Sequence, residues 1–157
     1  MLIAKKVFTL FVTSLIALVV ASAAQAGLTS AEASLLRAMN STRASFGLRP
    51  LRVDATLERA ARFHSGEMLR SGAFSHGDFL ARLTGFHARG PVLGENLAWG
   101  SGPYASPQAI VREWLASPEH RANLLRPGFG RIGIGTLQGT FQGYDGASVV
   151  TADFAGR

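Results

Sequence analysis

The spacing of apolar residues changes from a helical to an alternating pattern close to Leu125. Before that point, apolar side chains recur three or four positions apart, which is typical of helices buried on one face. Beyond it, the pairs Ile132/Ile134 and Val149/Thr151 are each spaced two positions apart, which indicates strands. Helices first and strands last, without a regular βαβ alternation, predict an α+β domain with an antiparallel sheet.

Capping signals mark where four helices are expected to begin. Residues 29–32 (Thr-Ser-Ala-Glu) fit a capping box, and Asp54 can cap a second helix. Ser106 and Ser117 each stand before a proline, and the helix after Ser117 is expected to run through Leu125. Gly47 and Gly72 are expected to end the first two helices. The expected core positions are Leu35, Met39 and Phe46 in the first helix, Leu57, Ala61, His64 and Met68 in the second, and Ile110, Val111, Trp114 and Leu115 after Ser106.

The pattern is weaker between residues 73 and 106. The stretch "DFLARLTGF" predicts a short helix, whereas "GPVLGENLAWGSGPYAS" is rich in glycine and proline and predicts a loop with an extended centre. Within the strand region, turns are expected at Gly139 and at residues 144–146 (Tyr-Asp-Gly).

The first twenty-six residues have the features of a secretory signal peptide. Lys5 and Lys6 precede an apolar run at residues 7–20, and Ala24-Gln25-Ala26 supplies small residues for cleavage after Ala26. The apolar run is shorter than the roughly 20 residues that a membrane-spanning helix needs. The sequence therefore predicts a signal peptide at residues 1–26, one mature domain at residues 27–157 without a stable membrane span, and a secreted or periplasmic location.

Composition limits how this domain is stabilised and which partners suit it. The chain has no cysteine, so packing alone must hold the fold together. Without the two lysines of the signal, the net charge of +6 falls to 6 − 2 = +4. A basic exported protein favours anionic partners such as envelope lipid or cell-wall polymer. The arginines are scattered and do not alternate with aromatic residues, so a nucleic-acid partner is not expected.

The four histidines differ in their surroundings. His64 falls on the apolar face of the second helix and is expected to be a core residue. His87 is expected to be exposed. His76 lies just past a helix end, where functional groups are often displayed. His120 falls near the third position of its helix, where the helix dipole favours the neutral imidazole that binds a metal or acts as a base. From position alone, His120 is either a surface residue or a site residue.

Glu95 is the best carboxylate candidate. It lies between Gly94 and Asn96 among apolar residues, and a carboxylate in such a place is costly unless it meets a cation, a metal or several donors. Ser117 is three residues from His120, but its place before Pro118 is typical of a helix cap rather than of a nucleophile.

Four ordered stretches, "AARFHSGEMLRSGAFSH", "GENLAWG", "WLASPEHRANLL" and "IGIG", resemble the CAP superfamily (cysteine-rich secretory proteins, antigen 5 and pathogenesis-related 1). They are most similar to its cysteine-free bacterial branch, described as SCP-like or YkwD-like. The resemblance implies an α-β-α sandwich with a central antiparallel sheet. It also implies a cleft that carries two histidines and two acidic residues, with a divalent metal such as zinc on the histidines in some members.

By motif, His76, Glu95 and His120 match three of these four cleft residues, so the resemblance implies that they are the catalytic candidates. His76 and His120 are the implied ligands of a weakly held metal. The fourth acidic residue is replaced by Ser117, and the nearby Glu113 and Glu119 do not match the motif. The resulting hypothesis is a monomeric, exported protein that binds a ligand or partner of the cell envelope or extracellular space. The alternative is a metal-assisted hydrolase that acts on peptide or cell-wall material.

Overall fold

The structure of the protein is a computed structural model that describes residues 27–157, so the predicted signal peptide lies outside the described residues. The helices are α1 (Ser30–Ser45), α2 (Ala55–Ser71), α3 (Phe79–Gly85), the short 3-10 helix η1 (Gly102–Ala105), α4 (Pro107–Ala116) and α5 (Pro118–Leu124). The strands are β1 (Arg52–Val53), β2 (Val92–Gly100), β3 (Phe129–Phe141) and β4 (Tyr144–Gly156). Within this part of the chain, none of the helices combines the length and apolarity that a membrane crossing requires.

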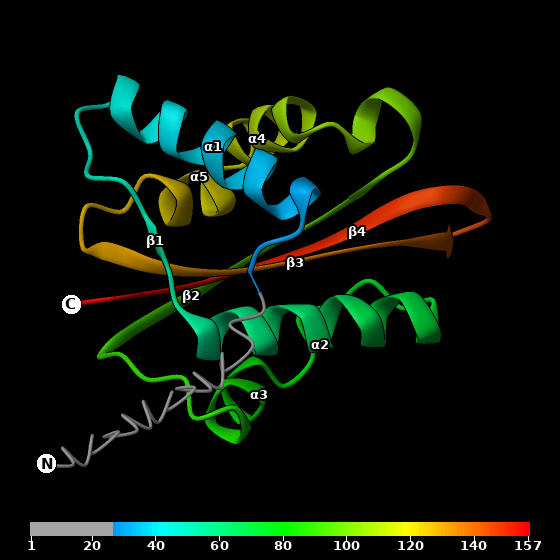
Figure 1. The fold of residues 1–157 in the computed structure, drawn as a ribbon, viewed down its shortest axis with the longest axis horizontal. Coiled ribbons are helices and arrows are strands. Elements are labelled where there is room, and N and C mark those ends of the chain that lie inside the picture. Colours follow the sequence, from blue (N-terminus) through cyan, green and yellow to red (C-terminus); the bar gives the residue numbers. More distant parts are fainter. Residues whose placement is uncertain (1–26) are drawn as a thin grey trace, which may run out of the picture.

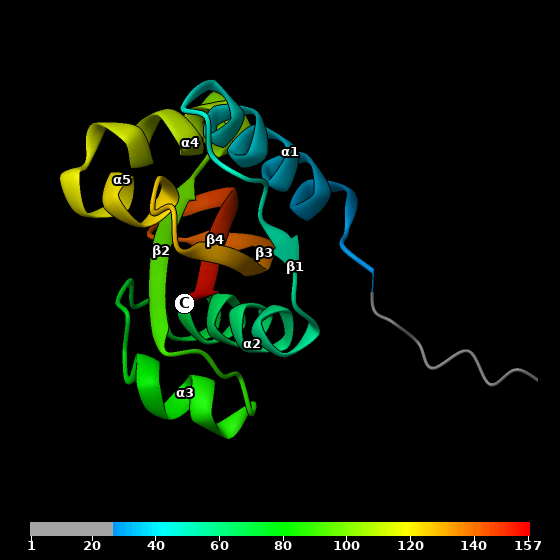
Figure 2. The ribbon, with the colours of Figure 1, turned by 90° about the vertical axis from the view of Figure 1, so that its left-hand side faces the viewer.

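One sheet separates two helical layers, which confirms the predicted α-β-α sandwich (Figure 1). Helices α1, α4 and α5 cover one face, while α2 and α3 cover the other (Figure 2). The strand order is β1-β3-β4-β2, so β2 forms an edge. Strands β2 and β3 each pair antiparallel with β4, but β1 pairs parallel with β3. The sheet is therefore mixed rather than purely antiparallel, because β1 carries the chain from one helical layer to the other along the sheet margin.

The helix ends follow the capping signals. Thr29 and Glu32 form the expected capping box, Asp54 accepts hydrogen bonds from backbone N–H groups at the start of α2, and Gly72 ends α2 in the left-handed conformation. Phe46, expected in the core, is instead exposed just past the end of α1. The inward position near this end belongs to Arg43, which the sequence pattern did not predict.

Arg43 is a fully buried charged side chain that joins the end of α1 to the end of α5 and the start of β3. Its guanidinium donates hydrogen bonds to the carbonyl oxygens of Leu124 at 2.8 Å and Phe129 at 3.0 Å, and its Nε to that of Arg49 at 2.9 Å. Burial lowers the pKa of Arg43 from its usual value. The guanidinium supplies donors to carbonyl groups that would otherwise be buried without a partner.

Helix α2 packs unusually close to the sheet at the "IGIG" stretch of β3. A Cβ atom on Gly133 would collide with the backbone of Leu57, and one on Gly135 with the backbone of Ala61. The hydroxyl of Ser65 lies 2.9 Å from the carbonyl oxygen of Gly135. The expected inward residues of α2, His64 included, are all buried.

The strands differ from expectation in their extent and in the positions of the turns. The stretch predicted as a loop with an extended centre contains β2, a nine-residue strand whose centre is buried. The predicted turns lie within strands, because Gly139 belongs to β3 and Tyr144 opens β4. The turn is instead at Gln142 and Gly143, where both residues have positive φ, as a two-residue hairpin turn requires.

Candidate functional site

The side chains of His76 and Glu95 meet beside the edge strand β2. His76 lies in the segment between α2 and α3, and Glu95 lies on β2 itself. The Nδ1 atom of His76 is 2.6 Å from Oε1 of Glu95. The imidazole is 55% exposed, whereas the Glu95 side chain is only 2% exposed. A buried carboxylate therefore holds an accessible imidazole and leaves its Nε2 atom for a ligand.

Arg82 of α3 supplies the cation that the buried Glu95 requires. Its guanidinium donates a hydrogen bond to Oε2 of Glu95 and another, at 3.1 Å, to the backbone oxygen of His76. Asp78 caps α3 by accepting a hydrogen bond from the backbone N–H of Ala81 at 3.0 Å. The capped helix α3 thus places Arg82 between the loop that carries His76 and the sheet.

Asp153 lies beneath this pair and is fully buried. It stands opposite Glu95 in the register of β2 and β4, so both carboxyl groups project from the same face of the sheet. Burial, and then the charge of Glu95, raises the pKa of Asp153 well above its ordinary value. The two carboxyl groups influence each other's pKa. Because Glu95 has Arg82 and His76 as donors, we infer that Asp153 is the protonated partner.

His120 comes from the opposite helical layer, as the third residue of α5. Asn96 of β2 donates a hydrogen bond to the backbone oxygen of His120 at 2.9 Å, and Asn123 of α5 donates one to the backbone oxygen of Glu95 at 3.1 Å. Burial, and then the positive charge of His76, lowers the pKa of His120. The lowered pKa agrees with the sequence prediction, although its main cause is burial rather than the helix dipole. We call His76, Glu95 and His120 the cleft.

An open groove of about 700 Å³ begins at His120 and extends along β2. Residues from β2, η1, α4 and the β3–β4 hairpin line it, among them Trp99, Tyr104, Arg112, Glu113 and Tyr144. His76 and Glu95 are not part of this lining, so His120 is the residue shared by the groove and the cleft. We call this feature the aromatic groove.

Residues 36–154 match the cysteine-rich secretory protein family, CAP. The chain is a member of the CAP family. The match spans nearly the whole of the described part of the chain, so the CAP domain carries both the cleft and the aromatic groove.

Among its CAP relatives, the chain is 29% identical over 141 residues to the uncharacterized protein YkwD of Bacillus subtilis. That alignment covers 87% of this chain and 51% of YkwD, so the chain spans about half the length of that relative. An extracellular SCP-domain protein of Bacillus anthracis is similar in structure, with a TM-score of 0.66, 26% identity and coverage of 83% of this chain and 45% of that one. An outer surface protein of Borrelia burgdorferi has the same fold, with a TM-score of 0.66, 23% identity and coverage of 78% and 90%. These two structural relatives are therefore extracellular or outer-surface proteins.

A zinc site with three protein ligands does not fit the side chains of the CAP cleft. Within residues 27–157, no three histidine, cysteine, aspartate or glutamate side chains are placed to share one metal ion. Both carboxylate oxygens of Glu95 are engaged, one by His76 and the other by Arg82. His76 and His120 alone thus remain as the predicted metal ligands, one short of the three protein ligands of catalytic zinc sites.

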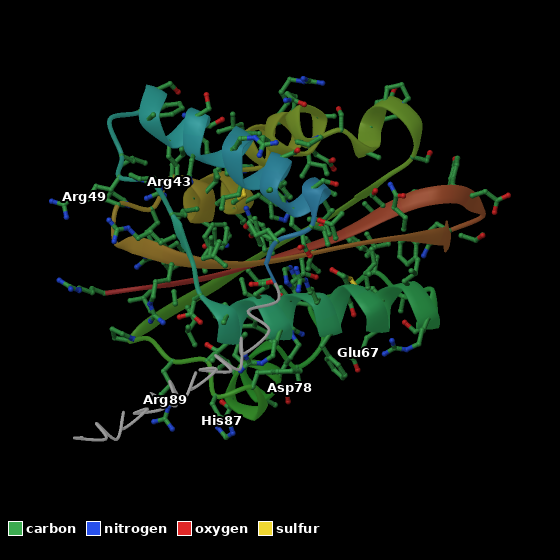
Figure 3. The ribbon with its side chains drawn as sticks, in the orientation of Figure 1. Arg43, Arg49, Glu67, Asp78, His87 and Arg89 are labelled. Carbon is green, nitrogen blue, oxygen red and sulfur yellow. The ribbon has the colours of Figure 1, made fainter. Side chains whose placement is uncertain are left out.

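The other residues considered from the sequence lie away from the cleft or play a structural part. His64 is buried and lies 2.9 Å from the backbone oxygen of Ser75. His87 is exposed and lies at the periphery of the domain (Figure 3). Ser117 occupies the position before α5, but its side chain makes no capping hydrogen bond, so its expected capping role was wrong.

Sequence reasoning missed Arg82 and Asp153. Arg82 sits in a short helix with many possible roles for an arginine. Asp153 lies in an apolar strand, and a buried acidic residue there is a signal of the same kind that singled out Glu95. The argument that identified Glu95, applied to the last strand, would have identified Asp153.

Proposed function

We propose that this CAP domain is an exported binding protein, and that the cleft together with the aromatic groove receives a ligand of the cell envelope or extracellular space. The observation that carries this proposal is the rigid support of the cleft at the end of an open groove. Glu95 and Arg82 fix the His76 side chain, and Asn96 and Asn123 fix α5, which carries His120. Groups held in place before binding lose little conformational entropy when a ligand arrives.

The expected partners are an anionic envelope lipid or a cell-wall polymer, and the expected location is secreted or periplasmic. The charge of +4 over residues 27–157 (14 arginines against 10 acidic residues) supports attraction to anionic envelope material. We expect a monomer. We also expect no nucleic-acid partner, because the arginines are scattered along the sequence.

The second candidate is a hydrolase that acts on peptide or cell-wall material, in the metal-assisted form considered from the sequence. The observation that favours it is the contact between His76 and the buried Glu95, because a carboxylate that orients an imidazole is a common arrangement for a general base. A divalent ion held by His76 and His120 would polarise a bound carbonyl group or water.

Sedimentation of the purified domain with envelope material tests the binding function. Residues 27–157, which contain the complete core, would be mixed with purified cell-wall polymer or with vesicles that contain phosphatidylglycerol. We expect co-sedimentation that His76→Asn and His120→Asn weaken. His87→Asn is the matched control, since His87 is exposed, lies away from the cleft and has a positive φ that asparagine tolerates.

The same preparation separates the two candidates. Bound zinc would be measured, and hydrolysis of peptide, ester and cell-wall substrates would be followed with added zinc and with a chelator. Turnover that both cleft variants abolish would establish the hydrolase. Binding without turnover would support the binding protein, and equal sedimentation of all three histidine variants would reject a role of the cleft in binding.

A further inference from the structure

Four aromatic side chains line the aromatic groove, and besides Phe74, which follows α2, three of them come from separate elements. Trp99 is on β2, Tyr104 on η1 and Tyr144 at the start of β4. Tyr104 is 76% exposed and Tyr144 is 54% exposed, so both rings offer much of their surface to solvent. The rings of Trp99 and Tyr144 have centroids 5.6 Å apart and are inclined by 44°. The groove thus has several aromatic surfaces of different orientation within a short distance.

These rings are carried by rigid parts of the backbone. η1 folds back on the end of β2 so closely that a Cβ atom on Gly100 would lie 2.7 Å from the backbone oxygen of Tyr104. Tyr144 pairs with Phe141 across the hairpin turn. Trp99 also packs edge-on against the buried Phe141, with centroids 5.6 Å apart. The aromatic positions are therefore set before any ligand arrives.

The charged groups of the groove balance one another. Arg112 contributes one positive charge and Glu113 one negative charge. The groove lining therefore has little net charge, although the domain as a whole is basic. A neutral ligand with many hydrogen-bonding groups suits it better than an anion.

An acyl chain fits this lining poorly. It would cover the polar groups of Arg112, Glu113 and His120 without offering them a hydrogen bond, and such burial is unfavourable. The aromatic residues also have polar atoms, in the hydroxyl groups of Tyr104 and Tyr144 and the indole N–H of Trp99.

An extended peptide is also disfavoured as a strand added to β2. Such a peptide would need free backbone acceptors along the edge of this strand. The carbonyl oxygen of Leu97 accepts a hydrogen bond from the Trp114 indole at 2.9 Å, and that of Glu95 accepts one from Asn123 at 3.1 Å. Two edge carbonyls are thus already used by side chains of the helical layer.

We propose that the aromatic groove binds a neutral glycan chain, with its sugar rings stacked on Tyr104, Trp99 and Tyr144 and its hydroxyl groups bonded to Arg112, Glu113 and His120. A sugar ring has an apolar C–H face and a rim of hydroxyl groups, which matches aromatic surfaces beside short polar side chains. This inference rests on the proposed binding function and changes one part of it, since it names a neutral glycan, rather than an anionic lipid, as the ligand of the groove.

Intrinsic fluorescence gives a direct test, because the chain has two tryptophans and only one lines the groove. Trp114 is fully buried, so it should respond little to a ligand in the groove. The probe is chitotetraose, a soluble neutral oligosaccharide, added to residues 27–157. We expect a saturable change in tryptophan emission, which Trp99→Phe removes while Trp114 remains as the reference signal.

Affinity for chitotetraose, measured by calorimetry, should fall roughly tenfold or more in Tyr104→Ala, the loss that a stacking contact of this kind represents. Phe63→Ala is the matched control, since Phe63 is also an exposed aromatic residue but lies on α2 outside the groove. Equal affinity of the Tyr104 and Phe63 variants, or no binding of chitotetraose, would overturn the inference. The inference would also be overturned if the fluorescence of Trp99 changed on addition of phosphatidylglycerol vesicles, a sulfated oligosaccharide or an uncharged peptide but not on addition of the neutral sugar.

The outcome also distinguishes this inference from the proposed function. If envelope material sediments with the domain in a way that depends on His76 and His120 but not on Tyr104, the binding function stands and the glycan inference fails. If neither the envelope material nor chitotetraose binds, both fail.

Discussion

Asp153 stands directly opposite Glu95 across the β2–β4 pair, and neither oxygen of its carboxyl group has a hydrogen-bond partner among residues 27–157. Arg82 approaches Oδ1 of Asp153 only to 3.9 Å, while it contacts Glu95 directly. One proton on Asp153 therefore lets two buried carboxyl groups share a single arginine. This arrangement fixes the orientation of Glu95 and, through Glu95, that of His76.

Asp153→Asn should change how stability depends on pH. Burial and the charge of Glu95 raise the pKa of Asp153 well above its ordinary value, so between about pH 4 and that raised pKa the folded state holds a proton that the unfolded state has lost. The free energy of unfolding of the wild type should therefore fall as the pH rises through this interval. Asparagine has nearly the same shape as aspartic acid and does not titrate, so the variant should show a flatter profile and be at least as stable at pH 7.

Urea denaturation of both proteins between pH 4 and pH 8 measures this difference. Glu95 also has a pKa raised by burial, and because it interacts with Asp153, the difference between the two profiles reports the titration of this carboxyl pair. Parallel profiles would mean that Asp153 is ionised in the folded protein.

Arg82→Ala should destabilise the domain by about 3–5 kcal/mol, because it leaves the buried Glu95 carboxylate without its cation. Arg89→Ala is the control, since Arg89 is exposed and lies at the periphery, and it should cost no more than about 0.5 kcal/mol (Figure 3). Chemical denaturation checks both values. A small effect of Arg82→Ala would mean that Glu95 takes up a proton at little cost.

The parts of the fold that local chemistry decides could be predicted from the sequence. Thr29, Asp54 and Gly72 act on their own backbone neighbours, so their roles as helix caps and terminator follow from residue type and spacing. Arg43 could not be predicted in this way, because three of its four acceptors, those on Leu124, Arg126 and Phe129, lie more than eighty positions away. Burial of an arginine contradicts the usual preference and is favourable only once those carbonyl groups are assembled.

The cleft shows the same limit. The need of Glu95 for a cation follows from its apolar neighbours, but the identity of that cation depends on the packing of α3 against the sheet. His76 and His120 were paired by resemblance to a family and not by spacing, since they come from opposite helical layers. The stretch that contains β2 was expected to be a loop with only an extended centre because its glycines favour turns, whereas Gly94 and Gly100 permit close approach of Asn123 and Tyr104.

Asp54→Asn should remove one source of acid sensitivity. Burial alone would raise the pKa of Asp54, but hydrogen bonds from Thr56, Arg131 and the backbone outweigh it and bring the pKa to about 2. This carboxylate therefore stabilises the fold above its unfolded pKa of 3.8, and the stabilisation is lost as the pH falls from about 4 to 2. Allowing for solvent at the partly exposed Arg131, we expect a loss of about 1–2 kcal/mol at pH 7 in the variant.

The comparison between Asp54→Asn and the wild type isolates the charge of Asp54, because asparagine caps a helix about as well as aspartate. Thermal unfolding from pH 2 to pH 7 should show that the two proteins converge in stability at the acid end. A constant difference across this range would assign the effect to the cap rather than to the charge.

The pKa of His120 should depend on His76. Burial lowers the pKa of His120, and the positive charge of His76 lowers it further. In His76→Asn the pKa of His120 should rise, yet stay below 6.5 because the burial remains. Titration of the histidine ring protons by NMR, with a chelator present, measures this shift, and His87→Asn provides the control. An unchanged pKa of His120 in His76→Asn would show that the two imidazoles do not share a cleft.

Alanine at Gly133 or Gly135 should prevent α2 from packing on β3. A Cβ atom at either position would overlap backbone atoms of α2, which cannot move aside as a flexible side chain can. We expect each variant to lose about 3 kcal/mol or more, at the upper end of what overpacking costs. Gly130→Ala is a control in the same strand, because a Cβ atom there meets no heavy atom within 4 Å, and it should leave stability nearly unchanged. Denaturant unfolding compares the three variants. Similar stability of all three variants would mean that α2 can shift away from the sheet. The position of His76, which follows the end of α2, would then be less fixed than the cleft requires.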